Sequence, residues 1–268
     1  MKPFVETIAE LLASGYTEAN VEEKLAQDIM LKALSQCGLK AQVTVKGGVV
    51  MATLTRDIRR TTMDLDIDLI RHSLSDESID EMIRKMNCID GVTIVRVGDI
   101  VELKQQDYSG KRVFVSIRDT AGYAVQYKLD IGVHTVEAAR QEDMEFDLTH
   151  IGFGSATLLA NAPEQVFVEK LKSLLRLGTI SSRGKDIFDM VYLASVVDEN
   201  VLKRLMDAYI YSDKRMFERN VADVVRRLMR VFSDSGFMAM LANPRMNWLK
   251  ISPVEATRRL VAFMKTLA

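Results

Sequence analysis

Aspartate occupies every second position in the stretch DLDIDLI, as Asp64, Asp66 and Asp68, and leucine or isoleucine fills the positions between them. A strand directs alternate side chains to opposite faces. This spacing therefore packs the apolar residues on one face and gathers three carboxylates on the other. Carboxylates at such close range repel one another and resist burial. The pattern indicates a positive partner, and a divalent cation is one that oxygen ligands suit.

A glycine pair precedes the aspartates. Gly47 and Gly48 follow the apolar run QVTV, and without a Cβ they let backbone N–H groups approach a phosphate closely. A plain tight turn is the alternative interpretation. Arg56, Arg59 and Arg60 then crowd the loop before the aspartates, either as a solvated face or as a phosphate clamp. A glycine turn beside paired carboxylates is what a magnesium-bound nucleoside triphosphate requires.

A further carboxylate comes from the stretch YKLDIGV. Strand alternation places Asp130 and Lys128 on one face and the apolar neighbours on the other. Two metal ions held by three carboxylates can bind both the entering and the leaving oxygen of an in-line displacement. The sequence therefore predicts a site for two Mg²⁺ ions at Asp64, Asp66 and Asp130, with Asp68 either at the wet end of its strand or sharing a metal.

The C-terminal half carries chemistry on helices. PEQVFVEKLKSLLRLG predicts an amphipathic helix with Lys170, and a helix lysine is ordinarily a surface residue. SSRGKDIFDMVYLA predicts a loop that enters a helix, where Arg183 and Lys185 can bind phosphate. Asp186 and Asp189 lie near the start of that helix, where carboxylates are favoured in any case.

The remaining pattern predicts the elements that position these residues. Residues 1–38 show two apolar stripes at helical spacing, and QVTV and DLDIDLI predict strands separated by a short helix. From 91 to about 153 alternation predicts further strands, among them separate strands at GVTIVRVG and DIVELKQ. Helices return from 163. We predict an α+β fold, a mixed or antiparallel sheet of about five strands flanked by helices, with domains at 1–155 and 156–268.

Composition narrows the class of protein. The chain has 268 residues, 48% hydrophobic and 27% charged, as a globular protein has. No apolar run approaches the roughly 20 residues that span a bilayer, and Glu6 and Glu10 interrupt the N-terminus, so we expect a cytoplasmic protein that binds no membrane. Cys37 and Cys88 lack metal-ligand spacing and are expected to be free thiols, buried or half-buried.

The net charge of −1 conceals an asymmetry. Residues 1–150 hold 18 Lys and Arg against 25 Asp and Glu, whereas residues 151–268 hold 18 against 12, which gives −7 and +6. Such a split suggests that a polyanion or nucleotide approaches the second half. The basic residues there include a group of arginines compatible with RNA, namely Arg226, Arg227, Arg230, Arg258 and Arg259.

Taken in chain order, the motifs resemble those of the AbiEii/AbiGii (MenT-like) nucleotidyltransferase toxins, in the DNA polymerase β-like nucleotidyltransferase superfamily. The resemblance rests on four successive motifs after the glycine pair: Thr62-Met63-Asp64-Leu65-Asp66, Lys128-Leu129-Asp130, Gln165 through Glu169-Lys170, and Arg183-Gly184-Lys185-Asp186. Val49 departs from the serine frequent after the glycines. Both Asp64/Asp66 and Asp66/Asp68 satisfy the D-x-D pattern, and Thr62 favours the first pair.

The resemblance implies roles for these residues. The catalytic set would be Asp64, Asp66, Asp130, Lys170 and Asp186, with Lys170 reaching the triphosphate and Asp186 orienting Lys170 or a catalytic water. The nucleotide-binding set would be Gly47, Gly48, Thr62, Lys128, Arg183 and Lys185. The expected partners are an NTP, an RNA acceptor, in particular the 3′ end of tRNA, and a cognate antitoxin.

Three functions follow from this sequence. The first transfers a nucleoside monophosphate from an NTP to RNA with release of pyrophosphate, as the toxin of a toxin-antitoxin or phage-defence system. The second transfers the nucleotide to a protein or to a small molecule such as an aminoglycoside. The third is a regulator that binds NTP without turnover, and the complete carboxylate set argues against it because a pure binder has no need of Asp130.

Overall fold

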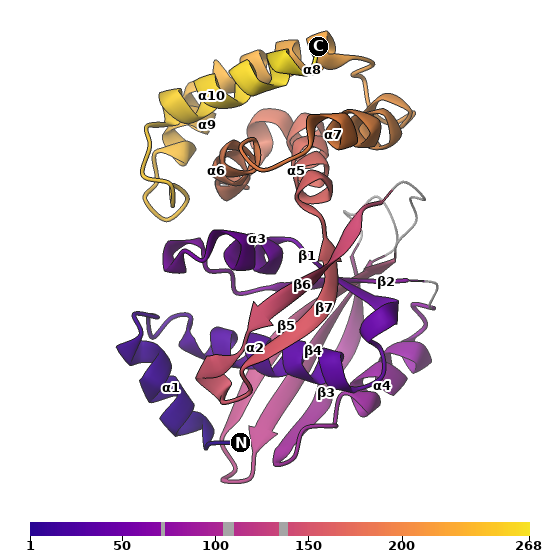
Figure 1. The fold of residues 1–268 in the computed structure, drawn as a ribbon, viewed down its shortest axis with the longest axis vertical. Coiled ribbons are helices and arrows are strands. Elements are labelled where there is room, and N and C mark those ends of the chain that lie inside the picture. The colour runs from indigo at the N-terminus through magenta and orange to yellow at the C-terminus, as the bar shows by residue number, and fades with distance from the viewer. Residues whose placement is uncertain (71–72, 104–109, 134–138) are drawn as a thin grey trace. The chain divides into compact units, whose positions relative to one another are not determined.

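The computed structural model describes residues 1–70, 73–103, 110–133 and 139–268, and these residues form two compact units. Met1–Thr135 with Gln141–Asn161 make up the first, called the sheet unit here. Val136–Arg140 with Ala162–Ala268 make up the second, the helical unit. Each unit is described by itself (Figure 1).

The sheet unit is built on one mixed sheet in the order β3-β4-β5-β2-β1-β7-β6. The strands are β1 (Val43–Lys46), β2 (Leu65–Leu69), β3 (Val92–Leu103), β4 (Gly110–Asp119), β5 (Ala124–Val133), β6 (Gln141–Asp147) and β7 (Ser155–Asn161). Strand β2 pairs antiparallel with β1 and parallel with β5, and β1 pairs parallel with β7. The predicted α+β class with a mixed sheet is confirmed.

Two predictions about strands were wrong in detail. The stretches GVTIVRVG and DIVELKQ contribute to a single strand, β3, because its pairing with β4 continues across a bulge between Val97 and Val101. A bulge breaks the alternation that defines a strand in sequence. Strand β7 begins at Ser155, where no strand was predicted, and it pairs antiparallel with β6.

Four helices accompany the sheet: α1 (Phe4–Ala13), α2 (Val21–Gln36), α3 (Gly48–Thr55) and α4 (Asp76–Lys85). Helix α4 starts where the hydroxyl of Ser75 accepts a hydrogen bond from the backbone N–H of Ser78, as an N-cap does. The buried stripe of α2 includes Leu25 and Ile29, which are fully buried. The two helices predicted within residues 1–38 and the short helix predicted between QVTV and DLDIDLI are confirmed.

Strands β4 and β5 show which side of the sheet is packed. Val113, Val115 and Ile117 are fully buried, whereas Phe114 is exposed, Ser116 is half-buried and Arg118 is exposed. Such strict alternation indicates an antiparallel region with one face in the core and the other toward solvent. The carboxylates of the candidate site lie on the side of Phe114, because Phe114, Arg112, Lys128 and Asp130 share that face by register.

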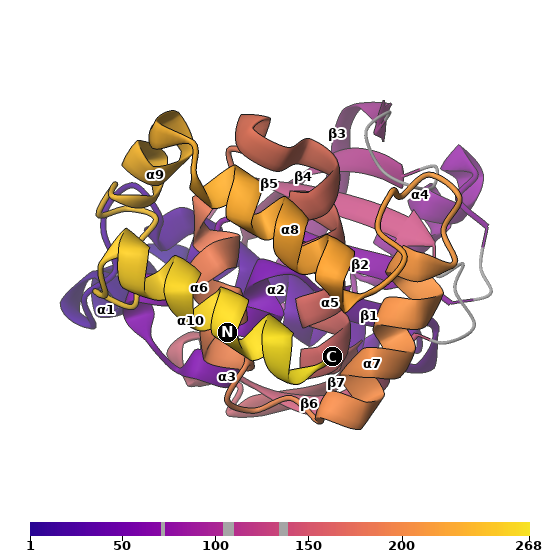
Figure 2. The ribbon, with the colours of Figure 1, turned by 90° about the horizontal axis from the view of Figure 1, so that it is seen from above.

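Six α-helices make up the described helical unit: α5 (Pro163–Leu177), α6 (Gly184–Leu193), α7 (Glu199–Met206), α8 (Val221–Phe232), α9 (Ser235–Leu241) and α10 (Pro253–Thr266). Helix α5 starts with Pro163 at its first position, where the missing N–H costs nothing, and ends before Gly178 at φ +57°. Phe167 packs edge-on against Phe263, with ring centroids 5.6 Å apart. Helices α8 and α10 lie side by side (Figure 2).

The two cysteines differ in how far solvent reaches them. Cys37 and Cys88 are both free; Cys37 is half-buried as predicted, but Cys88 is exposed, so the prediction of a sheltered thiol was wrong there. Cys88 lies in the loop after the end of α4. Within the residues described, no helix combines the length and apolarity that crossing a membrane requires.

Candidate active site

Four charged residues stand in one row across the sheet. By register, Lys46 of β1 lies beside Asp66 of β2, Asp66 beside Asp130 of β5, and Asp130 beside Arg112 of β4. Residues paired in this way project from the same face, with Cβ atoms about 5 Å apart. The sheet thus places two carboxylates next to each other with a cation at either end. We call Lys46, Asp66, Asp130 and Arg112 the carboxylate row.

Basic side chains supply the positive partner that the alternating aspartates require. Asp64 forms an ion pair with Lys128 at 2.5 Å, and Asp68 forms one with Lys46 at 2.6 Å. Asp68 is only 2% exposed, so the interpretation that it lies at the wet end of its strand was wrong. A buried carboxylate needs a compensating charge at hydrogen-bonding distance, and Lys46 provides it.

Asp130 is held in a fixed orientation by Arg112. Nε of Arg112 donates to Oδ1 of Asp130 at 2.7 Å, and Nη2 donates to Oδ2 at 2.8 Å. Two parallel bonds of this kind fix the plane of the carboxylate as well as its position. The hydrogen bond to Asp130 raises the pKa of Arg112, and the charges of Asp64 and Asp66 add to the effect, so both lie within electrostatic reach of the guanidinium.

The glycine pair lies directly against this row. Gly47 has φ +71°, and a Cβ added to it would lie 2.5 Å from Oδ2 of Asp66. A Cβ added to Gly48 would lie 2.5 Å from Oγ1 of Thr62. Close approach to Thr62 therefore requires a glycine at position 48, whereas position 47 requires one by its backbone angle, and a Cβ there would also displace the carboxylate of Asp66. Because α3 begins at Gly48, the backbone N–H groups of its first turn start at the edge of the carboxylate row.

The donor set suits Mg²⁺ better than a transition metal, because carboxylate oxygens are hard ligands and the described residues that pair with Asp66 and Asp130 by register include no cysteine or histidine. Magnesium usually takes only one or two protein carboxylates and completes its shell with water and phosphate. Among the described residues, no group of three or more acidic, histidine or cysteine side chains forms a metal cage. The metal site at Asp64, Asp66 and Asp130 stays a prediction.

A buried glutamine of α2 supports the backbone that leads into β2. Nε2 of Gln27 lies 3.4 Å from the carbonyl oxygen of Thr62, 3.5 Å from that of Asp64, and 3.4 Å from the hydroxyl of Tyr127. Burial raises the pKa of Tyr127 far above its usual value, so this phenol stays protonated. Gln27 thereby connects the helix layer to the segment that carries Asp64.

The helical unit holds a second group of charges. Nζ of Lys170 on α5 lies 2.5 Å from Oδ1 of Asp186 and 2.9 Å from Oδ2 of Asp189, both on α6. Asp189 is fully buried, and its Oδ1 accepts a hydrogen bond from the indole N–H of Trp248 at 3.0 Å. Asp189 therefore does more than favour a helix start: it is one of the two carboxylates that bind Lys170, and the hydrogen bond from Trp248 orients it.

The other residues of the two C-terminal motifs lie near this group. The side-chain amide of Gln165 donates to Oε1 of Glu169 at 2.7 Å, and Gln165 is fully buried. Arg183 precedes the first residue of α6 and is exposed, and Lys185 lies in its first turn, half-buried. The placement of Arg183 and Lys185 at a helix start is as predicted, and their binding of phosphate stays a prediction.

The predicted site residues thus fall into two groups. The sheet unit brings together Gly47, Gly48, Thr62, Asp64, Asp66, Lys128 and Asp130, and the helical unit contains Lys170, Arg183, Lys185 and Asp186. The sequence analysis missed Lys46, Arg112 and Gln27, and it gave Asp189 only the ordinary role of a carboxylate at a helix start. For Lys46 and Arg112 a signal existed, because alternation along QVTVK and KRVFVSI puts both on the polar face. The contacts of Gln27 with Thr62 and of Asp189 with Trp248 span more than 30 residues, and no local pattern predicts them.

Comparison with known proteins bears on both groups. The family model described as "Nucleotidyl transferase AbiEii toxin, Type IV TA system" matches residues 29–250. No curated protein is significantly similar in sequence. A solved structure that the chain resembles is an antigenic nucleotidyltransferase-like protein from Paracoccidioides brasiliensis, 14% identical, with a TM-score of 0.42, covering 69% of this chain and 88% of that one.

Proposed function

Because the chain belongs to the AbiEii family of nucleotidyl transferase toxins, we propose that it transfers a nucleoside monophosphate from a magnesium-bound NTP to the 3′-terminal hydroxyl of an RNA, in particular a tRNA. Pyrophosphate leaves. Capping the 3′ end of tRNA in this way would stop translation, which suits the toxin of a toxin-antitoxin system with a cognate antitoxin as its partner.

The observation that carries the proposal is the register of Asp66 and Asp130 on adjacent parallel strands, beside a glycine turn that starts a helix. Asp64 and Asp66 would hold Mg²⁺, and when bound the metal neutralises phosphate charge and orients the reacting oxygens. The turn at Gly47 and Gly48 would accept the β- and γ-phosphates on its backbone N–H groups.

The charges around the row favour entry of the nucleotide together with its metal. Four carboxylates, Asp64, Asp66, Asp68 and Asp130, face three cations, Lys46, Lys128 and Arg112. A free nucleoside triphosphate would add about four negative charges to a group that is already negative, and it would be repelled. The magnesium complex brings a much smaller net charge.

Asp130 would take the proton from the acceptor hydroxyl as its oxygen attacks the α-phosphorus. The new bond joins that oxygen to phosphorus, the bond from phosphorus to the bridging oxygen of pyrophosphate breaks, and the proton stays on Asp130 until solvent removes it. Arg112 holds Asp130 in one orientation through two hydrogen bonds, so the carboxylate is in place before the acceptor arrives.

Lys170 would contact the triphosphate from the helical unit. An ammonium group there stabilises the charge that develops on pyrophosphate as it leaves. Asp186 and Asp189 fix its position from two sides, and are positioning residues in this scheme. Arg183 and Lys185 would add positive charge at the start of α6.

Incubation of the purified chain with each α-³²P-labelled NTP, Mg²⁺ and total tRNA tests the proposal. Label on RNA that requires Mg²⁺ and disappears with EDTA supports it. Label on the protein itself or on an added aminoglycoside would assign another acceptor, and NTP binding without transfer would overturn the proposal.

Variants identify the site within the same assay. Asp66→Ala and Lys170→Ala should abolish labelling, and full activity in both would show that the assigned roles are wrong. Asp80→Asn serves as the matched control, because Asp80 is an exposed aspartate of α4 whose partner is Arg96.

A further inference from the structure

We propose that the open face of strands β3, β4 and β5 binds the single-stranded 3′ end of the acceptor RNA and leads its terminal hydroxyl to Asp130. The inference rests on the proposed transfer to RNA. We define the open face by six residues: Val95, Val97, Val101, Phe114, Arg118 and Lys128.

Large apolar side chains are uncovered on this face. Val95 is 49% exposed, Val97 37%, Val101 47% and Phe114 39%. The register joins them, since Val97 pairs with Phe114 and Val95 and Val97 are two residues apart on one strand. A continuous apolar surface of this kind on a folded protein commonly marks a binding site.

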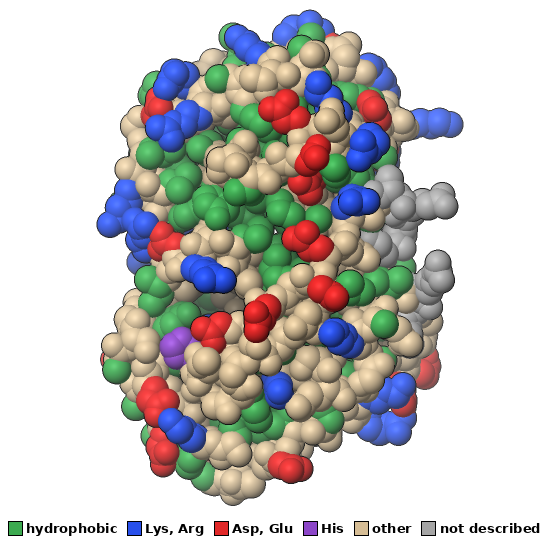
Figure 3. All heavy atoms as spheres, in the orientation of Figure 1, with side chains coloured by type: hydrophobic (Ala, Val, Ile, Leu, Met, Phe, Trp, Pro, Cys, Tyr) green, Lys and Arg blue, Asp and Glu red, His purple; other side chains and the backbone are tan. Residues whose placement is uncertain are grey.

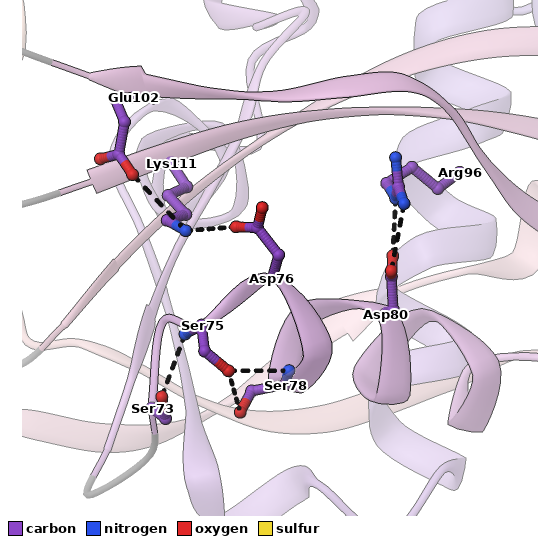
Figure 4. A network of polar contacts seen from close by, with 8 residues as sticks. All are labelled: Ser73, Ser75, Asp76, Ser78, Asp80, Arg96, Glu102 and Lys111. Carbon is purple, nitrogen blue, oxygen red and sulfur yellow. Dashed lines mark hydrogen bonds and ion pairs between the residues drawn. The ribbon is translucent and has the colours of Figure 1, made fainter.

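The opposite face of the same strands is already occupied. Helix α4 is tied to it by the pairs Arg96 with Asp80 and Lys111 with Asp76, and Lys111 also contacts Glu102 (Figure 4). Helix α2 reaches Tyr127 of β5 through Gln27. The exposed valines and Phe114 therefore face away from the helix layer of the sheet unit.

The charges on the open face are complementary to RNA. The described positions of β4 and β5 on this side include Arg112, Arg118 and Lys128, and among them the only carboxylate is Asp130 of the candidate site. This contrasts with the net charge of about −7 on the first 150 residues. Cations that surround an aromatic ring are what a single strand requires, because bases stack on the ring and phosphates pair with the cations.

The face also runs without interruption into the carboxylate row. Phe114 pairs by register with Lys128, and Lys128 binds Asp64. Arg112, two residues before Phe114, binds Asp130. From Val97 across Phe114 to Lys128 is two strand spacings, about 10 Å. A base stacked on Phe114 would therefore place the end of its strand within a nucleotide or two of Asp130.

A protein partner is the competing occupant, and the observations favour RNA over it. An apolar protein surface would not need a line of cations, and it would gain nothing from adjoining the residue that activates the acceptor. A single-stranded RNA end needs both.

Fluorescence anisotropy with the full chain and a labelled single-stranded RNA tests the inference directly. Phe114→Ala should weaken binding about tenfold, the loss of one stacked base, and Phe114→Trp should retain it. Arg118→Glu should also weaken binding and reduce its salt dependence. Phe217→Ala, at a phenylalanine that is 93% exposed in the helical unit, and Arg84→Glu, on α4, are matched controls that should bind like wild type.

Unchanged RNA affinity in both Phe114→Ala and Arg118→Glu would overturn the inference. So would loss of self-association in Phe114→Ala without loss of RNA binding, since the face would then join two copies of the chain. The transfer assay separates the two proposals. Transfer to RNA with an unchanged RNA KM in Phe114→Ala sinks this inference alone, whereas RNA binding through the face without any nucleotide transfer sinks the proposed function.

Discussion

The sheet unit and the helical unit each gather carboxylates around basic side chains, but they differ in how far solvent reaches them. In the sheet unit the side chains of Asp64, Arg112 and Lys128 are 49%, 34% and 31% exposed. In the helical unit Lys170 is 11% exposed and Asp189 is fully buried. An ion pair open to solvent can exchange its partner for a ligand at little cost, whereas a sealed pair holds its geometry and is expensive to break.

The net charges of the two halves of the chain also differ. Basic residues outnumber acidic ones after residue 150, and Figure 3 shows Lys and Arg side chains over the surface of the helical unit. Several of the arginines that we expected to contact RNA are engaged locally: Arg226 with Asp223, and Arg258 and Arg259 with Glu255. Exposed pairs of this kind leave the positive field in place, because they contribute little and re-form easily.

The largest expected effect is a loss of transfer rate at Asp66 in the sheet unit, with little change in stability. Asp66→Asn should lower the rate of nucleotidyl transfer at least about 1000-fold, since a metal-binding carboxylate is lost. Stability should change by less than about 1 kcal/mol or rise slightly, because Asp64 and Asp130 no longer repel a third charge. Transfer rates and urea denaturation on the same preparation measure both, with Asp80→Asn as control. A large loss of stability would place Asp66 among the structural pairs.

The pair of Lys46 and Asp68 is an exception to this difference in exposure, because it is buried although it belongs to the sheet unit. Lys46→Met should destabilise the protein by about 3 to 5 kcal/mol, as it leaves Asp68 charged and buried. The double variant Lys46→Met with Asp68→Asn should recover most of that loss. A double-mutant cycle in urea measures the coupling. Additive effects would show that the two side chains do not depend on each other.

Variants of Asp189 measure the cost of breaking a buried ion pair in the helical unit. Asp189→Ala should cost about 3 kcal/mol, because Lys170 and the indole N–H of Trp248 both lose an acceptor in a buried place. Asp189→Asn keeps an acceptor for Trp248 and should cost less. Denaturation followed by the fluorescence of Trp248, the single tryptophan, measures both variants. Equal losses in the two variants would show that the whole effect comes from the lost ion pair with Lys170 and none from the hydrogen bond to Trp248.

The sequence predicted the residues of the sheet site better than their partners. Alternation alone placed Asp64, Asp66 and Asp68 on one face of their strand, and Lys128 and Asp130 on one face of theirs, because the period of a strand is fixed by covalent geometry. The partners depend on which strands become neighbours. Arg112 meets Asp130 only because β4 pairs with β5 at one register among several, and that choice is made by the whole core.

The same reason explains the errors in the fold. The alternation of β3 is interrupted at its bulge, and a single sequence shows that interruption as two strands. Strand β7 reads SATLLAN, a short run that composition alone cannot distinguish from a loop or a helix start. The helices were predictable because their apolar stripes are long, as in α2 and α5.

The smallest expected effect is the pH-dependent contribution of Asp213, in the helical unit, to the stability of the fold. Hydrogen bonds from Arg215, and then from Lys172 at 2.8 Å, hold the pKa of Asp213 well below its usual value. A carboxyl group with a lowered pKa stabilises the fold above its unfolded pKa, near 4, and the contribution is lost as pH falls through the lower folded value. Asp213→Asn should therefore cost about 1 kcal/mol at pH 7.

The pH series itself decides whether that cost is ionic. The difference in stability between wild type and Asp213→Asn should shrink below pH about 4, because the unfolded wild type then binds a proton at Asp213 that the folded protein takes up only at lower pH. The backbone N–H of Arg215 keeps an acceptor in the asparagine variant, since Asn also offers a side-chain oxygen. A difference that stays constant from pH 7 down to pH 3 would show that Asp213 acts through shape and hydrogen bonding. The charge itself would then contribute nothing, and the pair with Lys172 would stabilise the fold no more than an exposed pair does, although both of its side chains are only 11% exposed.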